Sequence, residues 1–399
     1  MSLLQMAESL RSLANMIEQN ILSPKKLKLI DNFLLNFSSP KISSTLSTPE
    51  DFSSRCPPEV LEHILHFLPP KDLKSAVLVN KKWLEVGGRP NLWHWAKLSL
   101  QSGQGNFAVA FALLKGTRGI RSLKALQLSS HETMMLVAAV AENESLEEVH
   151  LEGCSLNQVE PGLLSIAVSH LAKVNLQNLI FTEEQLASLF SCTATNCNLS
   201  SLIVEEVNLS RVAPDLLLSV AKLAELTLSS TLLTTEQTRL LWTAIAEEGN
   251  FSSFKFEGVN LASIDTEALA KVATKASKIS LCNTSLTADQ VNALAIALAT
   301  NSQIQEVDLS DNFLTDINPE MLARAVARTR KLSLVNTGLT TDQVNQLLES
   351  LLSEASIMED LDLSANILSF IEPDLMAHSL NKLKMVTLLD SAVSVNQVW

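Results

Sequence analysis

LEEVHLEGCSLNQVEPGLLSIAV, residues 146–168, is the stretch that decides the fold, because four further copies of it follow. The copies begin at Leu199, Phe251, Ile304 and Met358, so successive starts are 53, 52, 53 and 54 residues apart. A fixed period of this length is typical of a solenoid, in which each repeat packs only against its neighbours.

A second type of unit lies between these copies. It begins at residues 171, 223, 276 and 329, and the last of these reads TRKLSLVNTGLTTDQVNQLL. A degenerate unit starts at Leu123, and another starts at Leu383. Every unit carries the pattern L-x-x-L-x-L-x-x-N/C/T-x-L and then a helical segment. The alternating apolar residues predict a short strand, so each unit is expected to contain one strand and one helix.

The expected helices begin with recognisable signals. In the second type of unit, Thr followed three residues later by Gln predicts a capping box, in which each side chain accepts a hydrogen bond from the other residue's backbone N–H. The pairs are Thr182–Gln185, Thr234–Gln237, Thr287–Gln290 and Thr340–Gln343. In the first type, a proline predicts the helix start, because its missing N–H would be unpaired there anyway. These residues are Pro161, Pro214, Pro319 and Pro373, with Thr266 in the third copy.

These units predict an α/β solenoid over residues 123–399. No unit can bury both of its faces alone, so stacked strands form a parallel sheet that the helices cover. Strands are spaced more closely than helices, so the stack is expected to curve with the strands inside. The pattern resembles leucine-rich repeats of the ribonuclease-inhibitor-like kind, and that resemblance implies a horseshoe.

Two segments precede the folded cassette described next. Residues 1–37 have leucines at helical spacing and predict two short helices. Their apolar faces could pack on the rest of the chain, which amphipathic helices usually do, or could pair two chains. Residues 38–54 are rich in Ser, Thr and Pro, a composition typical of a linker.

CPPEVLEHILHFLPPKDLKSAVLVNKKWLEV, residues 56–86, occurs once and does not follow the repeat. Its apolar residues predict very short helices within 55–98, and residues 99–122 are expected to connect this cassette to the array. A core of this size is marginal, so the cassette is expected to need a partner or a neighbouring domain.

The cassette resembles an F-box. That family has Leu-Pro-x-Glu-x-Leu-x-x-Ile, a Leu-Pro-x-x-Asp-Leu turn, a Val-x-x-x-Trp element and a final Leu-Trp. The matching residues here are Pro57, Glu59, Leu61, Ile64, Leu68, Pro69, Asp72, Leu73, Val79, Trp83, Leu92 and Trp93. Cys56 stands in place of the opening leucine, and this smaller side chain would weaken docking without removing it.

The F-box resemblance implies that the cassette binds a Skp-type adaptor, which joins the protein to a cullin–RING ubiquitin ligase. The repeats would then select the protein substrate, as in F-box proteins of the leucine-rich-repeat class. The residues implied for the adaptor face are Pro57, Glu59, Val60, Ile64, Leu65, Leu68, Leu73, Val79 and Trp83. Several of them could equally form the core of the cassette, and for Ile64 and Trp83 both interpretations stay open.

The strand residues between the apolar positions are expected to line the concave face in three rows. Lys278, Glu306, Lys331 and Asp360 alternate in the first row and predict cross-strand ion pairs, each worth little energy. The surplus charge is negative, which favours a basic segment of a partner or, equally, a merely solvated face. The candidate substrate-binding residues are Glu148, His150, Glu152, Glu205, Glu257, Asp308 and Asp362. Aromatic anchors, frequent at interfaces, are missing from these rows.

Composition and motifs exclude several classes of function. With 30 Lys and Arg against 43 Asp and Glu, the net charge of −13 argues against nucleic acid or anionic lipid as the main partner. Five scattered cysteines and the lack of a signal pattern or long apolar stretch favour free thiols in the cytoplasm or nucleus. Glu62-His63-x-x-His66 lies in the cassette helix without metal-site spacing. No metal, cofactor or catalytic residue is therefore predicted.

Two functional hypotheses remain. The first is a non-catalytic substrate-recognition subunit of an SCF-type (Skp–cullin–F-box) ubiquitin ligase. The second is a ligase-independent leucine-rich-repeat scaffold or inhibitor whose F-box is a remnant, an interpretation that Cys56 favours.

Overall fold

The computed structural model describes residues 56–68, 72–73, 76–77, 79–93, 97–102, 107, 111, 114–115, 119–196, 198–249 and 251–393. The helices expected within 1–37 and the linker at 38–54 lie outside the described residues. The chain divides into two compact units. The N-terminal unit comprises residues 1–99, 105–123 and 143–146, and the repeat unit comprises 100–104, 124–142 and 147–399.

Short helices form the described part of the N-terminal unit: α4 (Pro58–His66), α6 (Lys81–Gly87) and the 3-10 turn η1 (Pro90–Leu92). Pro58 is the first residue of α4, where its missing N–H costs nothing. The core is apolar and includes Leu61, Leu65 and Trp93. The indole N–H of Trp93 donates to the carbonyl of Gly87, so the one polar atom of this buried ring is satisfied.

In the described part of the chain, twelve strands form one open sheet in which spatial order follows sequence order. Neighbouring strands from β3 to β12 are parallel. The strands are β1 (Lys97–Gln101), β2 (Ser122–Leu126), β3 (Glu148–Glu152), β4 (Lys173–Gln177), β5 (Ser201–Glu205), β6 (Glu225–Ser229), β7 (Ser253–Glu257), β8 (Lys278–Ser280), β9 (Glu306–Asp308), β10 (Lys331–Ser333), β11 (Asp360–Asp362) and β12 (Met385–Thr387). The sheet begins at β1, upstream of Leu123, where the repeats were expected to start.

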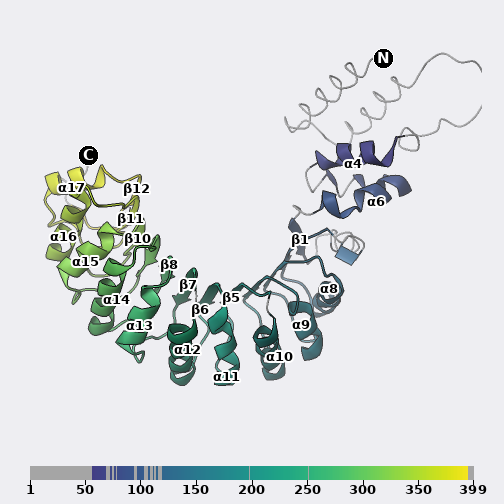
Figure 1. The fold of residues 1–399 in the computed structure, drawn as a ribbon, viewed down its shortest axis with the longest axis horizontal. Coiled ribbons are helices and arrows are strands. Elements are labelled where there is room, and N and C mark those ends of the chain that lie inside the picture. The colour runs from purple at the N-terminus through teal and green to yellow at the C-terminus, as the bar shows by residue number, and fades with distance from the viewer. Residues whose placement is uncertain are drawn as a thin grey trace, which may run out of the picture. The chain divides into compact units, whose positions relative to one another are not determined.

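A helical segment follows each of the strands β2 to β11 and lies on the outer side of the sheet (Figure 1). These segments are α8 (Ser130–Glu142), α9 (Pro161–Val168), α10 (Glu183–Thr195), α11 (Pro214–Leu217) with the 3-10 turn η2 (Leu218–Lys222), α12 (Thr235–Glu248), α13 (Thr266–Ala273), α14 (Ala288–Thr300), α15 (Pro319–Ala327), α16 (Thr341–Leu352) and α17 (Pro373–Leu380). Within the repeat unit the strands line the inner side of the curve, so the predicted leucine-rich-repeat-like solenoid is confirmed.

The predicted helix starts are also confirmed. All four capping boxes form, in α10, α12, α14 and α16, with both reciprocal hydrogen bonds present. The four prolines occupy the first position of their helices. In the third copy, Asp265 caps α13 by accepting from the backbone N–H of Glu267. Each repeat therefore sets its own strand-to-helix turn locally.

The capping glutamines also join neighbouring units. Gln290 is buried, and its Nε2 donates to the carbonyls of Leu261 at 2.8 Å and Ile264 at 2.7 Å, both in the preceding unit. Gln185, Gln237 and Gln343 make the same contacts in their own places. At the other end of α14, Asn301 Nδ2 donates to the carbonyls of Ala273 and Ala276. These amides satisfy buried carbonyls that no sheet or helix hydrogen bond reaches.

Candidate functional site

Helix α4 has two apolar sides, and one of them is more exposed than the other. Leu61 and Leu65 are buried. Val60 and Ile64 are partly exposed, and Phe67 is 48% exposed. Positions 60, 64 and 67 share one face of a helix, so these three residues form an accessible stripe. Most short helices bury their apolar side chains, and a second apolar face on a marginal unit favours a binding surface.

Apolar side chains are also accessible around α6. Val79 and Leu84 are each 53% exposed, and Trp83 is half-buried. Asn80 caps α6, because its side chain accepts a hydrogen bond from the backbone N–H of Trp83 at 3.0 Å. This hydrogen bond fixes the backbone of Trp83 in the first turn of the helix. The indole Nε1 of Trp83 is buried and finds no acceptor among the described residues.

The nine residues implied for the adaptor face separate by burial. Leu65, Leu68 and Leu73 are at most 4% exposed, so they belong to the core and can support a docking surface only from beneath. Accessible members of the set are Pro57, Glu59, Val60, Ile64, Val79 and Trp83. Sequence reasoning missed Phe67 and Leu84, although the helical spacing from Ile64 to Phe67 could have indicated the former.

Cys56, the departure from the family pattern, points inward. It is 4% exposed, its Sγ donates to the carbonyl of Pro57, and burial raises the pKa of its thiol. The smaller side chain therefore acts on packing within the unit, and the accessible stripe is unaffected. Glu62, on α4, pairs with Arg89 beyond α6 and ties these two segments together.

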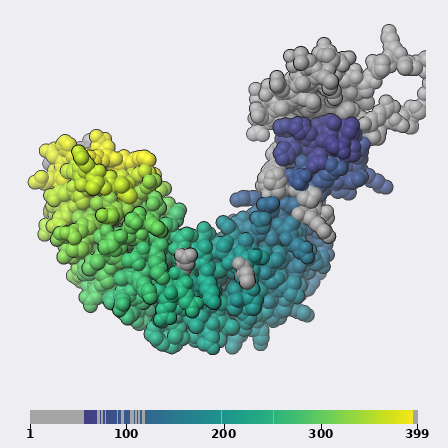
Figure 2. All heavy atoms as spheres, viewed as in Figure 1, coloured from purple at the N-terminus to yellow at the C-terminus, as the bar shows by residue number. Residues whose placement is uncertain are grey.

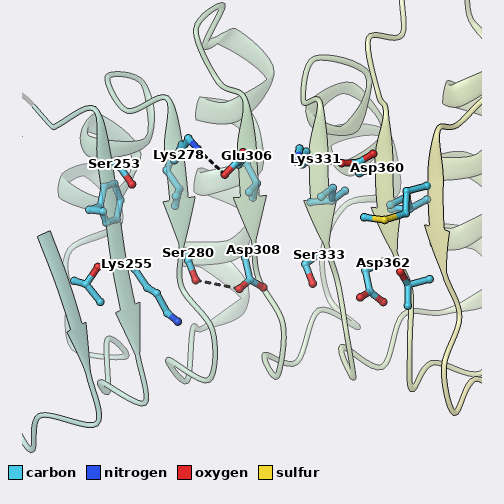
Figure 3. A pocket seen from close by; sticks show the side chains of 18 residues that line it. Ser253, Lys255, Lys278, Ser280, Glu306, Asp308, Lys331, Ser333, Asp360 and Asp362 are labelled. Carbon is cyan, nitrogen blue, oxygen red and sulfur yellow. Dashed lines mark hydrogen bonds and ion pairs between the residues drawn. The ribbon is translucent and has the colours of Figure 1, made fainter. Parts of the chain in front are cut away.

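The inner face of the repeat unit contains a shallow hollow of about 490 Å³ over strands β6 to β12. Figure 2 shows the repeat unit hollowed along this side. Strand side chains form its floor in rows, because successive strands place equivalent residues next to one another. The first row includes Ser253, Lys278, Glu306, Lys331 and Asp360, and the middle row includes Lys255, Ser280, Asp308, Ser333 and Asp362 (Figure 3).

The first row is neutralised by cross-strand ion pairs. Lys278 Nζ lies 3.0 Å from Glu306 Oε2, and Lys331 Nζ lies 3.1 Å from Asp360 Oδ2. The hydrogen bond with Asp360 raises the pKa of Lys331. The predicted ion pairs are thus confirmed between β8 and β9 and between β10 and β11.

Several of the predicted concave acids are also satisfied within the protein. Glu152 lies 3.2 Å from Lys124 Nζ and 3.2 Å from His150 Nε2, and the hydrogen bond with Lys124 lowers its pKa. Glu257 lies 2.6 Å from Lys255 Nζ, which likewise lowers the carboxyl pKa. Glu205 accepts a hydrogen bond from Gln177.

The remaining acids lack a cationic partner. In the described part of the chain, no ion pair involves Glu148, Asp308 or Asp362. Asp308 accepts from Ser280 Oγ at 3.0 Å and from the backbone N–H of Ser310 at 3.0 Å. Asp362 accepts from the backbone N–H of Ser364 at 2.9 Å. These neutral donors orient the carboxylates without adding a positive charge.

Cys282 lies close to three acids of the concave face. Burial, and then the carboxylates of Asp308, Asp311 and Glu257, raise the pKa of this thiol to about 12. A half-buried thiol surrounded by three acids is held protonated, so it is neither a nucleophile nor a metal ligand at neutral pH. The structure supports the interpretation of this face as an electrostatic surface.

Among the residues that the structure describes, no group of three or more His, Cys, Asp or Glu side chains could hold a metal ion. No helix in the described ranges is long and apolar enough to cross a membrane. The described residues thus present two candidate protein-binding surfaces, the apolar one on the N-terminal unit and the charged one on the repeat unit.

Parts of the chain are similar to known proteins. Residues 54–99 match the family model described as F-box-like. Among solved structures, the chain is similar to one from the "Structure of the Toll - Spatzle complex, a molecular hub in Drosophila development and innate immunity". The identity is 12% and the TM-score is 0.41, over 73% of this chain and 43% of that chain. This chain therefore spans less than half the length of that similar protein.

Proposed function

We propose that this protein is the substrate-recognition subunit of an SCF-type ubiquitin ligase. Its F-box-like domain would bind a Skp-type adaptor and through it a cullin–RING ligase. The repeat unit would hold the protein to be ubiquitinated. In this role the chain itself needs no catalytic residue and no cofactor, since other subunits would supply the ubiquitin transfer.

The observation that carries the proposal is the accessible apolar stripe of α4 in a matched F-box-like domain. Val60, Ile64 and Phe67 keep part of their surface exposed, whereas Leu61 and Leu65 on the other side of the helix are buried. Burying such side chains against a partner contributes about 25 cal/mol per Å² of apolar surface. A small unit with this surface is stabilised when an adaptor covers it.

The proposal also places the protein in the cytoplasm or nucleus, where such ligases work. The described cysteines Cys56, Cys154, Cys192 and Cys282 are free thiols, and the first three are buried. Buried unpaired thiols are typical of reducing compartments.

Binding of the purified full chain to a purified Skp-type adaptor, measured by isothermal titration calorimetry, tests the proposal. Phe67→Glu and Val79→Glu change exposed side chains, so both variants are expected to fold and to lose binding by at least about tenfold. Ile166→Glu, an equally exposed change on α9, is the matched control and is expected to bind as the wild type does.

A folded wild-type chain without affinity for any such adaptor would refute the proposal. The ligase-independent scaffold would then be the better hypothesis, with the partner bound to the repeats and not degraded. Circular dichroism of each variant separates lost binding from lost folding.

A further inference from the structure

The charges in the middle row of the concave face lie on alternate strands. Its members, each in register with the next, are Lys255, Ser280, Asp308, Ser333, Asp362 and Thr387. A serine therefore separates the two carboxylates. Strands are about 4.8 Å apart, so Asp308 and Asp362 lie about 10 Å from each other across the sheet.

Among the described residues that form the floor of the hollow, these two carboxylates take part in no ion pair, and Lys255 acts on Asp308 only at longer range. The lysines that line it, Lys255, Lys278 and Lys331, are each held by an acid at 2.6 to 3.1 Å. The acids of the hollow that remain without an ion pair are Asp308 and Asp362. A surface with satisfied cations and free anions complements a cationic ligand.

A single ion does not fit this arrangement. Two carboxylates about 10 Å apart cannot share one cation, whose oxygen ligands lie within about 2.6 Å of it. An open hollow of about 490 Å³ on a sheet face instead suits a chain segment that crosses the strands. In a polyproline II conformation, residues i and i+3 lie on the same side and about 9 Å apart, which matches the spacing of the two acids.

We propose that Asp308 and Asp362 recognise an extended segment of the substrate with two cationic side chains three residues apart. The proposal rests on the function proposed above and specifies the chemistry of its substrate. The hydroxyls between and beside the acids are engaged within the protein, because Ser280 donates to Asp308 and Ser333 shares a hydrogen bond with Ser310, so the two carboxylates carry the recognition. Met385, on β12, is 57% exposed and lies in register with Asp360, so an apolar residue beyond the second cation has a contact there.

A peptide-library selection on the purified full chain tests this proposal without assuming a substrate. Retained peptides are expected to be enriched in Lys or Arg at i and i+3. A fluorescent twelve-residue peptide with two lysines at this spacing is then expected to bind in an anisotropy titration, and its counterpart with two glutamates is not. Affinity is expected to fall as salt rises, because the contacts are ionic.

The decisive variant is Asp308→Asn/Asp362→Asn, which keeps the shape and removes both charges. The dilysine peptide is expected to bind it at least about tenfold more weakly, as the loss of two surface ion pairs would give. Glu247→Gln/Glu349→Gln makes the same change in net charge at exposed positions of α12 and α16 and is expected to bind as the wild type does.

Three results would overturn the proposal: no retention of the dilysine peptide by the wild type, equal binding by the Asp308/Asp362 variant, or equal weakening in the Glu247/Glu349 variant. Adaptor binding of the same preparations keeps the two proposals apart. Peptide binding without adaptor binding would refute the ligase role alone. Adaptor binding without peptide selectivity would refute the recognition pair alone.

Discussion

The backbone N–H of Thr284 donates to Asn312 Oδ1 at 3.1 Å, across the boundary between two neighbouring repeats. Both residues are buried, and Asn312 Nδ2 in turn donates to the carbonyl of Leu281 at 2.6 Å. Thr337 and Asn366 repeat the arrangement one pair of units later. In this part of the array, a buried asparagine therefore connects the turn of one unit to the turn before it.

Asn312→Ala is expected to lower the free energy of unfolding by at least about 3 kcal/mol. The change leaves several buried N–H and C=O groups without partners, and each costs about 1–3 kcal/mol. Urea denaturation followed by circular dichroism measures the loss. Asn260→Ala removes an exposed asparagine with one loop hydrogen bond, and a cost below about 1 kcal/mol is expected. Similar costs for the two variants would contradict the role given to Asn312.

Thr231 occupies the position of Thr284 in its own unit. In the unit that follows Thr231, Val259 stands at the position that Asn312 occupies later in the array. The side chain of Thr231 is fully buried, and its Oγ1 has no hydrogen-bond partner among the described residues. Val259→Asn is expected to change the free energy of unfolding by less than about 1 kcal/mol, because new hydrogen bonds to the Thr231 turn offset the lost apolar burial.

Val204→Asn is the matched control for this substitution. Val204, on β5, is equally buried, but it is not opposite a buried polar group that lacks a partner. The same urea experiment is therefore expected to show a loss of at least about 3 kcal/mol in the free energy of unfolding. Equal costs at positions 204 and 259 would show that Thr231 gains nothing.

The surroundings of Gly87, in the N-terminal unit, leave no room for a side chain. A Cβ at this position would come within 2.4 Å of Val77 Cγ1, and the carbonyl of Gly87 accepts from buried Trp93. Gly87→Ala is expected to destabilise this unit by about 1–3 kcal/mol through overpacking and to weaken adaptor binding with it. Thermal denaturation and the calorimetric titration measure both effects. Gly162→Ala, which meets nothing within 4 Å, is expected to leave both unchanged.

Cys282 is expected to resist alkylation. Its pKa near 12, against an ordinary value of 9.0, makes the reactive thiolate about 1,000-fold rarer at pH 8. Mass spectrometry of iodoacetamide-treated protein is expected to show labelling that rises about tenfold per pH unit from pH 7 to 10. Asp308→Asn/Asp311→Asn removes two of the acids and is expected to speed labelling, although burial remains. A plateau below pH 10 in the wild type would contradict the raised pKa.

The fold was largely predictable because its signals are local and recur. The Thr–Gln capping boxes and the prolines at helix starts depend on residues three positions apart, and every one of them forms. The second role of Gln290 was not predictable in the same way. The carbonyls that its amide reaches lie 26 and 29 residues upstream, and only the stacking of the units brings them together.

The positions of the candidate surface residues could be predicted from the sequence. Which of these residues stay exposed or without an ion pair could not. Strand alternation placed Glu257 and Asp308 on the same face. Lys255 forms an ion pair with Glu257, whereas Asp308 accepts a hydrogen bond from Ser280. Helical spacing likewise placed Ile64 and Leu65 side by side. Packing of the short helices decides that Leu65 is core and that Ile64 stays accessible.

The glutamine contacts between units also define what can be duplicated or deleted. Gln237, Gln290 and Gln343 follow one another at intervals of 53 residues, and each binds the carbonyls of the unit before it. If a whole pair of units is lost or gained, the side-chain amide of every capping glutamine still meets the backbone carbonyls that it binds. Loss of a single unit would place one of these glutamines beside a unit of the other type, where its two carbonyl partners are missing. The array is therefore expected to vary in length, in evolution or in engineering, by pairs of units.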